Sequence, residues 1–284
     1  MKKSALENKL ILGGSLEATG RDEATIRGAA SVIQPEQKIS IAYLGNETDE
    51  QRVATAGAIR ELGFWPVPHI SARRTKSAEA LESYLAGLQK VGANDRLIII
   101  GGDPKDPEGP YSDALSIIKS GIPKKYGVKD IGIAGYPEGH PDISNDVLWQ
   151  ALADKAAALT ANGYTGRICT QFSFDAEAVV KWIREVRARG IELPVRVGVP
   201  GPAGIKRLLG YATRFGVGTN AFIIKKYGLS LTNLMGTAGP DNFIRDLAKA
   251  LESDPSLGAV DLHYYTFGGI DTTAKWVQSS TAGK

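Results

Sequence analysis

The sequence has little of three features that mark special classes of protein. It contains one cysteine, Cys169, among 284 residues, which excludes an internal disulfide and any metal site built from several cysteines. Its 34 basic and 31 acidic residues leave a formal net charge of only +3, so a nucleic-acid-binding role is not expected. The longest apolar cluster, residues 97–100, is too short to cross a membrane, and residues 10–12 are too few for the apolar region of a signal peptide. These absences predict a soluble, cytoplasmic protein without a membrane partner.

What is present is the composition of an ordinary globular protein. Apolar residues make up 43% of the chain and charged residues 23%, both close to average. A chain of this length buries a large core without disulfides or metal ions. The length suits one or two average domains, or a single α/β barrel of roughly 250 residues. Disordered, collagen-like and disulfide-stapled proteins are excluded.

Short β-rich segments alternate with amphipathic segments along the chain. Several of the β-rich segments are nearly continuous apolar runs, which is typical of parallel strands covered on both faces. The predicted strands are residues 9–17, 38–43, 65–69, 97–101, 130–134, 167–171, 195–199 and 259–266.

The segments between the strands carry helix-start signals. Ser77, Ser144 or Asn145, and Asp175 stand where N-caps are expected, each before apolar residues three and four positions apart. Residues 215–257 exceed one β/α unit and predict a loop, a short extra helix and a helix over 241–252.

Eight β-then-α units predict a (β/α)8 TIM barrel that forms a single domain over residues 1–284. The alternative is an open doubly wound sheet. That fold usually shows a glycine-rich phosphate-binding fingerprint after its first strand, and residues 13–17 have the wrong spacing for one.

In a barrel, the catalytic groups lie at the carboxyl ends of the strands and in the loops that follow them. The residues found there are polar, aromatic or glycine, which suits a planar ligand that forms hydrogen bonds. They include Glu17, Tyr43, His69, Asp103, Tyr136, Glu138, His140, Gln171, Tyr265 and Thr266.

Two segments resemble motifs of the methylenetetrahydrofolate reductases. Residues 133–141, IAGYPEGHP, are similar to that family's Ala-x-Tyr-Pro-Glu-x-His-Pro segment, and residues 170–175, TQFSFD, to its Thr-Gln-x-x-Phe-Asp segment. Weaker similarities at residues 15–17, 68–70 and 263–266 follow in the family's order. The resemblance extends over about residues 10–267.

The resemblance implies an oxidoreductase of one-carbon metabolism and methionine biosynthesis. Such an enzyme interconverts 5,10-methylenetetrahydrofolate and 5-methyltetrahydrofolate. Opening the folate ring needs a proton at N10 and produces an N5-iminium cation, which accepts a hydride. In the family, non-covalently bound reduced FAD delivers that hydride and NAD(P)H reduces the FAD. The expected partners are therefore a folate and a nicotinamide dinucleotide, and a homo-oligomer is expected.

The resemblance also assigns roles to individual residues. It implies that Glu17 is the general acid, that Asp103 stabilises the cation electrostatically, that Gln171 orients the folate, and that Phe222 packs on a ligand ring. The expected flavin contacts are His69, Gly102, Asp103, Ala134, Tyr136, His140 and Lys155. No metal is expected, because Glu138, His140 and His263 lack the spacing of a metal site.

Some positions depart from the family, and alternatives stay open. Gly101 stands where the family has an arginine near the flavin, although Arg73 and Arg74 are nearby as possible phosphate ligands. The first alternative is therefore a folate reductase that takes hydride directly from NAD(P)H without flavin. The second is a folate- or flavin-binding subunit without turnover, against which Glu17 and Asp103 argue. Asp103 also has a purely structural reading, because Gly-Gly-Asp-Pro favours a turn. The electron donor, direction and subunit number are open.

Overall fold

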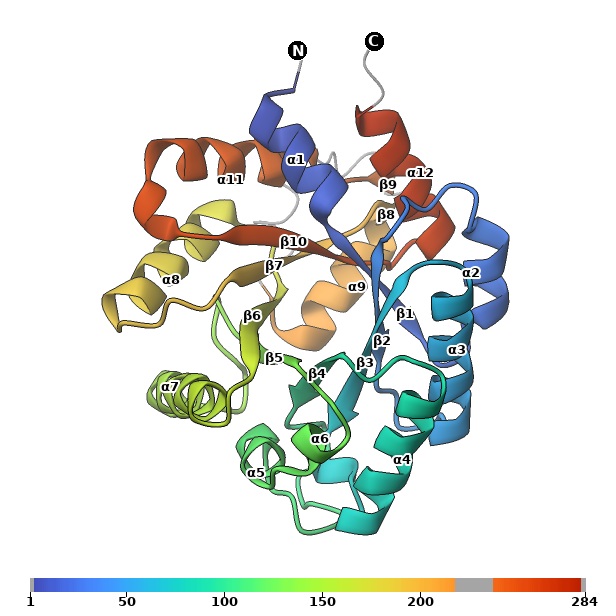
Figure 1. Cartoon of the computed structure of the whole chain (residues 1–284). Coiled ribbons are helices and arrows are strands. Elements are labelled where there is room, and N and C mark those ends of the chain that lie inside the picture. Colours follow the sequence, from blue (N-terminus) through green and yellow to red (C-terminus); the bar gives the residue numbers. More distant parts are fainter. Residues whose placement is uncertain (1–2, 218–236, 282–284) are drawn as a thin grey trace.

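The strands close into a barrel. The computed structural model describes residues 3–217 and 237–281, so Phe222 lies outside the described residues. Eight parallel strands pair in the order β1-β10-β7-β6-β5-β4-β3-β2 (Figure 1). They are β1 (Ser15–Thr19), β2 (Lys38–Ala42), β3 (Trp65–Ser71), β4 (Arg96–Ile100), β5 (Asp130–Gly135), β6 (Thr165–Phe172), β7 (Val195–Pro200) and β10 (Val260–Tyr265). The predicted (β/α)8 barrel is confirmed, and the open-sheet alternative is wrong because β1 pairs with β10.

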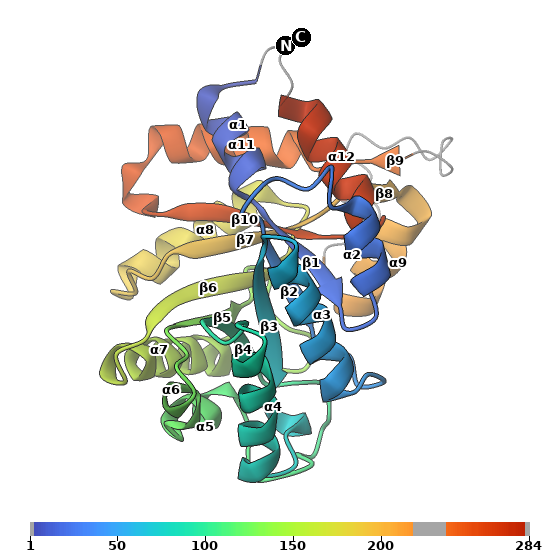
Figure 2. The same cartoon turned by 45° about the vertical axis from the view of Figure 1, so that its right-hand side comes forward.

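Helices surround the barrel, as the two views in Figures 1 and 2 show. They are α2 (Glu23–Ala29), α3 (Asp49–Glu61), α4 (Ala78–Lys90), α5 (Ala114–Lys119), α6 (Ile122–Lys125), α7 (Asn145–Ala161), α8 (Ala176–Ala188), α11 (Asp241–Ser253) and α12 (Ile270–Thr281), with short 3₁₀ turns η1 (Ala72–Arg74) and η3 (Pro255–Leu257). The predicted N-caps Ser77 and Asp175 accept hydrogen bonds from the backbone of α4 and α8. Ser144 caps α7 in sequence but makes no side-chain hydrogen bond to it.

The first predicted strand is wrong in its first half. Residues 5–13 form helix α1 (Ala5–Gly13), which begins at Ser4, and the strand begins at Ser15. Leu10 and Ile11 are buried in the helix, and an apolar run this short fits a helix as well as a strand. Gly14 makes the abrupt junction possible, because a Cβ there would lie 2.3 Å from the Tyr264 ring.

An insertion separates β7 from α11. It contains the short strand β8 (Ala203–Gly204), helix α9 (Ile205–Phe215) and strand β9 (Thr237–Ala238), which pairs antiparallel with β8. The predicted helix over 241–252 is confirmed as α11. The short extra helix expected after Phe215 falls mainly on residues outside the described ones. Within the described ranges, no helix is long and apolar enough to span a membrane.

The apolar core lies between the strands and the helices. Strand side chains alternate between two faces, and the buried aliphatic residues of β1, β2 and β7, such as Leu16, Ile39 and Val197, pack in the core cluster with helix residues. The alternate positions, among them Ser15, Glu17 and Arg196, therefore face the barrel interior. The interior of this barrel is polar. The end of the interior that lies toward the carboxyl ends of the strands forms the candidate site.

Candidate active site

Glu17 is the middle residue of β1, and its carboxylate contacts a histidine from the last barrel strand. Glu17 Oε2 is 3.4 Å from His263 Nε2, and the Glu17 side chain is 18% exposed. The Thr266 hydroxyl donates to the Glu17 backbone carbonyl at 2.6 Å. The side chain is thus held at the barrel mouth, partly shielded from water, by residues almost 250 positions away in the chain.

His69, in the second half of β3, supplies a second imidazole near Glu17. Burial lowers the pKa of His69 to about 4, against a smaller opposing influence of the Glu17 charge, so His69 is neutral at physiological pH. Its Nε2 is buried and has no hydrogen-bond partner in the described structure. The hydroxyl of Ser71, two residues along the same strand, is likewise buried and unpartnered there. These two polar atoms can receive hydrogen bonds from a ligand.

The turn after β4 places Gly102 against Ser71 and Asp103 in solvent. Gly102 has φ +97°, and a Cβ at this position would lie 2.1 Å from Ser71 Oγ, so only glycine fits. The Asp103 side chain is 90% exposed, and its carboxylate lies 4.0 Å from the Arg74 guanidinium. Asp103 is close enough to Tyr136 to raise the pKa of that phenol, although burial of Tyr136 is the larger cause.

Two predicted cofactor residues in the loop after β5 contact each other. The Tyr136 and His140 rings pack edge to face with centroids 5.3 Å apart. Ala134, two residues before Tyr136, accepts a hydrogen bond at 3.3 Å from Lys155 Nζ on α7. Burial lowers the pKa of Lys155 to about 8, and no carboxylate lies within salt-bridge distance of it among residues 3–217 and 237–281. Lys155 is therefore a sheltered cation that forms no ion pair in this part of the chain, although the charge of Asp113 opposes part of the fall in its pKa.

Gln171 lies at the end of β6, next to an aromatic residue of β10. Its side-chain oxygen accepts from the backbone N–H of Phe172 at 3.0 Å. The Tyr265 hydroxyl donates to the carbonyl of Thr170 at 3.1 Å, and burial is the main reason that the pKa of Tyr265 is raised. Glu17 also raises the Tyr265 pKa, because its carboxylate lies near that phenol.

Tyr265 belongs to a group of packed aromatic side chains whose other members were not predicted from the sequence. Tyr211 and Phe215 of α9 stack in parallel, and Tyr211 also stacks on Phe267 with centroids 3.9 Å apart. Phe172 packs edge to face against both Phe215 and Phe267. We call Phe172, Tyr211, Phe215, Tyr265 and Phe267 the aromatic wall. The four-residue spacing of Tyr211 and Phe215 in an amphipathic helix could have indicated it.

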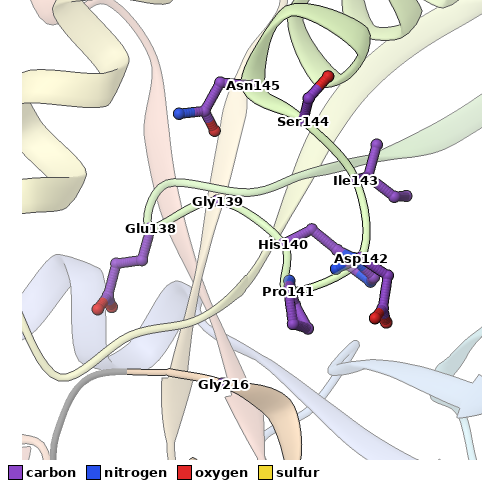
Figure 3. Close-up of a pocket in the computed structure, with 9 residues that line it drawn as sticks. All are labelled: Glu138, Gly139, His140, Pro141, Asp142, Ile143, Ser144, Asn145 and Gly216. Carbon is purple, nitrogen blue, oxygen red and sulfur yellow. The ribbon is translucent and has the colours of Figure 1, made fainter.

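The loop between β5 and α7 borders an open polar cavity of about 600 Å³. Figure 3 shows this loop, from Glu138 to Asn145, curving around the cavity, with Gly216 across from it. The Ser173 hydroxyl donates to Glu138 at 2.5 Å and so connects this loop to the end of β6. The cavity is large enough for part of a nucleotide or a folate.

Arg73 and Arg74, considered as phosphate ligands, are both held by the protein. Arg73 donates to the carbonyls of Pro104 and Ser112, and Arg74 pairs with Glu108 at 3.3 Å. Among the described residues, no group of three or more His, Cys, Asp or Glu side chains is arranged to hold a metal ion.

Comparison with known proteins identifies the family. The model of the family described as "Methylenetetrahydrofolate reductase" matches residues 33–217. The chain belongs to this family of oxidoreductases. It is 32% identical over 158 residues to Methylenetetrahydrofolate reductase 2 of Saccharomyces cerevisiae, a match that covers 52% of this chain but only 25% of the yeast protein. It is 25% identical over 236 residues to 5,10-methylenetetrahydrofolate reductase of Pectobacterium carotovorum, covering 80% of this chain and 74% of that relative.

A solved structure shares the fold. It is described as an uncharacterized protein from Clostridium thermocellum that binds two copies of 5-methyl-5,6,7,8-tetrahydrofolic acid. It superposes with a TM-score of 0.60 at 12% sequence identity and covers 98% of this chain and 99% of its own. At this identity the likeness supports the barrel fold only.

Proposed function

We propose that this family member interconverts 5,10-methylenetetrahydrofolate and 5-methyltetrahydrofolate at the mouth of the barrel. The observation that carries the proposal is Glu17, a partly buried carboxyl group on the inward face of β1, held against His263 and close to His69. A carboxyl group so placed can act as the general acid that the reaction requires at N10. The folate named for the Clostridium thermocellum barrel is consistent with a folate ligand here.

The surrounding residues orient the folate and exclude water. Gln171, at the end of β6, provides amide groups for the edge of the pterin ring. The aromatic wall provides faces on which planar rings stack, and offset or edge-to-face contacts of such rings are favourable. The aromatic wall and the neutral His69 bring no charge, so they make the surroundings of Glu17 less polar. In less polar surroundings the Glu17 charge acts more strongly on the developing folate cation.

The residues at the mouth also fit FAD. His69 Nε2 and Ser71 Oγ are buried without partners in the described structure, and Lys155 is a sheltered cation suited to a phosphate group. We infer that Lys155, Tyr136, His140 and the backbone at Gly102 and Ala134 hold the cofactor. When bound, reduced FAD supplies the hydride and NAD(P)H renews it.

A second candidate is direct hydride transfer from NAD(P)H to the folate. Two observations favour it. Gly101 replaces the arginine of the family motif, and the Asp103 carboxylate is 90% exposed rather than enclosed at the site. In that case Lys155 and the cavity of the β5–α7 loop would take the phosphates of the nicotinamide dinucleotide instead.

Titration and turnover separate the two candidates. The full chain is titrated with FAD while flavin fluorescence is followed, and folate reduction by NADH and by NADPH is then measured with and without added FAD. Saturable FAD binding with FAD-dependent turnover supports the flavin mechanism. Turnover without saturable FAD binding supports direct transfer, and no folate turnover under either condition contradicts the proposed function.

Glu17→Gln tests the proposed acid. The amide keeps the size of the side chain but cannot donate the proton, so folate reduction should fall by roughly 10²–10⁴-fold. The thermal melt should stay close to that of the wild type. In the flavin mechanism, NAD(P)H oxidation by an artificial acceptor should persist, because that half-reaction needs no proton at N10. Equal loss in both half-reactions would contradict the role of Glu17 as the acid.

A further inference from the structure

A buried chain of polar side chains leads from the barrel interior to Glu17. The Ser15 hydroxyl lies 2.8 Å from His263 Nδ1, and His263 Nε2 lies 3.4 Å from Glu17 Oε2. Ser15 is completely buried and His263 is 4% exposed. Ser15 and Glu17 both face inward from β1, and the β1–β10 pairing sets Ser15 directly beside His263. Closure of the barrel therefore creates the chain.

The distances indicate how the protons are arranged. The Ser15 hydroxyl carries one proton and has two acceptors in reach, His263 Nδ1 at 2.8 Å and the Leu262 carbonyl at 3.4 Å. The shorter contact is the stronger hydrogen bond. If Ser15 donates to Nδ1, the neutral imidazole carries its proton on Nε2, and this N–H points at Glu17.

We propose that His263, with its tautomer fixed by Ser15, is a positioning residue that donates from Nε2 to Glu17 Oε2. This inference rests on the proposed function and adds residues to its site. The donated hydrogen bond occupies Oε2 and leaves Oε1 to carry the proton destined for N10. As that proton departs, Glu17 becomes an anion, and the bond from His263 becomes charge-assisted and stronger. An interaction that strengthens as the reaction proceeds lowers the barrier.

Two other side chains face Glu17, but neither forms a hydrogen bond with its carboxylate in the described structure. His69 approaches from β3 and Tyr265 from β10. Burial lowers the pKa of His69 to about 4 and raises that of Tyr265, so both are uncharged near neutral pH. No hydrogen bond joins either side chain to the Glu17 carboxylate within the described ranges, whereas His263 is in contact with it.

Nuclear magnetic resonance tests the tautomer without any turnover. The sequence has three histidines, His69, His140 and His263, so ¹⁵N-histidine labelling gives three ring systems, and His263→Gln identifies its own by loss. Long-range ¹H–¹⁵N spectra should show His263 protonated on Nε2 in the wild type. Ser15→Ala should produce a mixture of tautomers. A proton resident on Nδ1 in the wild type would overturn the inference, whether or not the chain reduces folate.

Matched variants test the effect on the acid. His263→Leu removes the donor with similar volume, whereas His263→Gln replaces it with an amide N–H. Without a donor, the Glu17 anion is less stabilised, so the pH above which folate reduction declines should rise by about one unit. The rate below that pH should fall by roughly 10–100-fold, with KM little changed. In His263→Gln, both the pH of decline and the rate below it should stay close to the wild-type values.

The outcomes are distinguishable from failure of the proposed function. No folate turnover by the wild type rejects the function, while the spectra still decide the tautomer. Two results overturn the positioning role: a pH profile of His263→Leu that matches the wild type, or a rise in the pH of decline in His263→Gln as large as that in His263→Leu. If His263→Leu does not fold, as judged by circular dichroism, the pH profiles of Ser15→Ala and His263→Gln decide. Ser15→Ala should then show a rise in the same direction as the leucine variant.

Discussion

Lys155 illustrates how a single buried charge links the site to stability. Burial lowers its pKa from an ordinary value near 10.5 to about 8 in the folded state. Below pH 8 the folded protein therefore holds an ammonium group that the unfolded chain solvates better. Between about pH 8 and pH 10.5 the unfolded state binds more protons, so the contribution of Lys155 to stability improves as the pH rises.

We accordingly expect Lys155→Met to be more stable than the wild type at pH 7, by about 1–2 kcal/mol after allowance for the lost bond to Ala134. The gain should shrink toward pH 10, where the wild-type lysine is largely neutral. Urea denaturation of both proteins at the two pH values measures this. A variant less stable than the wild type at pH 7 would show that burial does not govern Lys155.

The position of Asp103 agrees less well with its expected electrostatic role than that of the other candidates. Its carboxylate is 90% exposed and only 4.0 Å from the Arg74 guanidinium, a contact that solvent screens. Asp103→Asn should therefore leave the free energy of unfolding within about 0.5 kcal/mol of the wild type. If ligand binding brings the charge to the folate cation, the folate half-reaction should slow by roughly 10²–10³-fold. Stopped-flow absorbance beside a thermal melt measures both, and an unchanged folate half-reaction would assign Asp103 to the turn alone.

At this scale, the sequence identified residues by their position but could not supply their partners. Glu17, His69 and Gln171 were chosen as candidates because each ends a strand predicted from the sequence, where barrel sites are built. The contact of Glu17 with His263 was not, because only the pairing of the first and last strands brings the two together. The exposure of Asp103 was also unpredictable, because it depends on the path of a turn containing a left-handed glycine.

Among the elements, α1 and α9 show two different limits of pattern reading. In α1, Leu10 and Ile11 form an apolar run that suits either a strand or a helix, and packing of α1 between α11 and α12 decides for the helix (Figures 1 and 2). In α9, the apolar face is recognisable, but its purpose is not. That face buries Leu208 and Ala212 and also brings Tyr211 and Phe215 to the aromatic wall.

Phe215 tests whether the aromatic wall binds folate. It is 38% exposed, so Phe215→Ala should lower the melting temperature less than truncation of a fully buried side chain does. Loss of one stacking face should raise KM for the folate by roughly 3–10-fold. The matched control is Leu208→Ala, a fully buried residue on the same helix, which should lose about 2–5 kcal/mol of stability. An unchanged KM in a destabilised Phe215→Ala protein would make the wall a packing element.

Across the whole molecule, the two ends of the barrel interior carry different kinds of side chain. The end toward the carboxyl termini of the strands carries Glu17, His69 and Gln171. The end toward their amino termini is closed by ion pairs between neighbouring strands. Arg196 on β7 forms two hydrogen bonds with Asp261 on β10, at 2.9 and 2.8 Å, and Arg167 pairs with Asp130. Side chains at the amino-terminal end of a barrel serve stability rather than chemistry.

The Arg196–Asp261 pair provides a test of that division. Arg196 is 2% exposed, so removal of Asp261 leaves a buried guanidinium without its hydrogen-bonded counter-charge. Because Asp261 is itself 37% exposed, we expect Asp261→Ala to cost about 2–3 kcal/mol, below the full penalty for a buried pair. The double variant Arg196→Met with Asp261→Leu removes both charges and should recover most of that stability. Urea denaturation of the wild type, single and double variants gives the comparison.

KM for folate should stay at the wild-type value in all these variants, because the Arg196–Asp261 pair lies at the opposite end of the barrel from Glu17. An Asp261→Ala protein as stable as the wild type, or one with impaired folate binding but normal stability, would contradict the separation of the two ends.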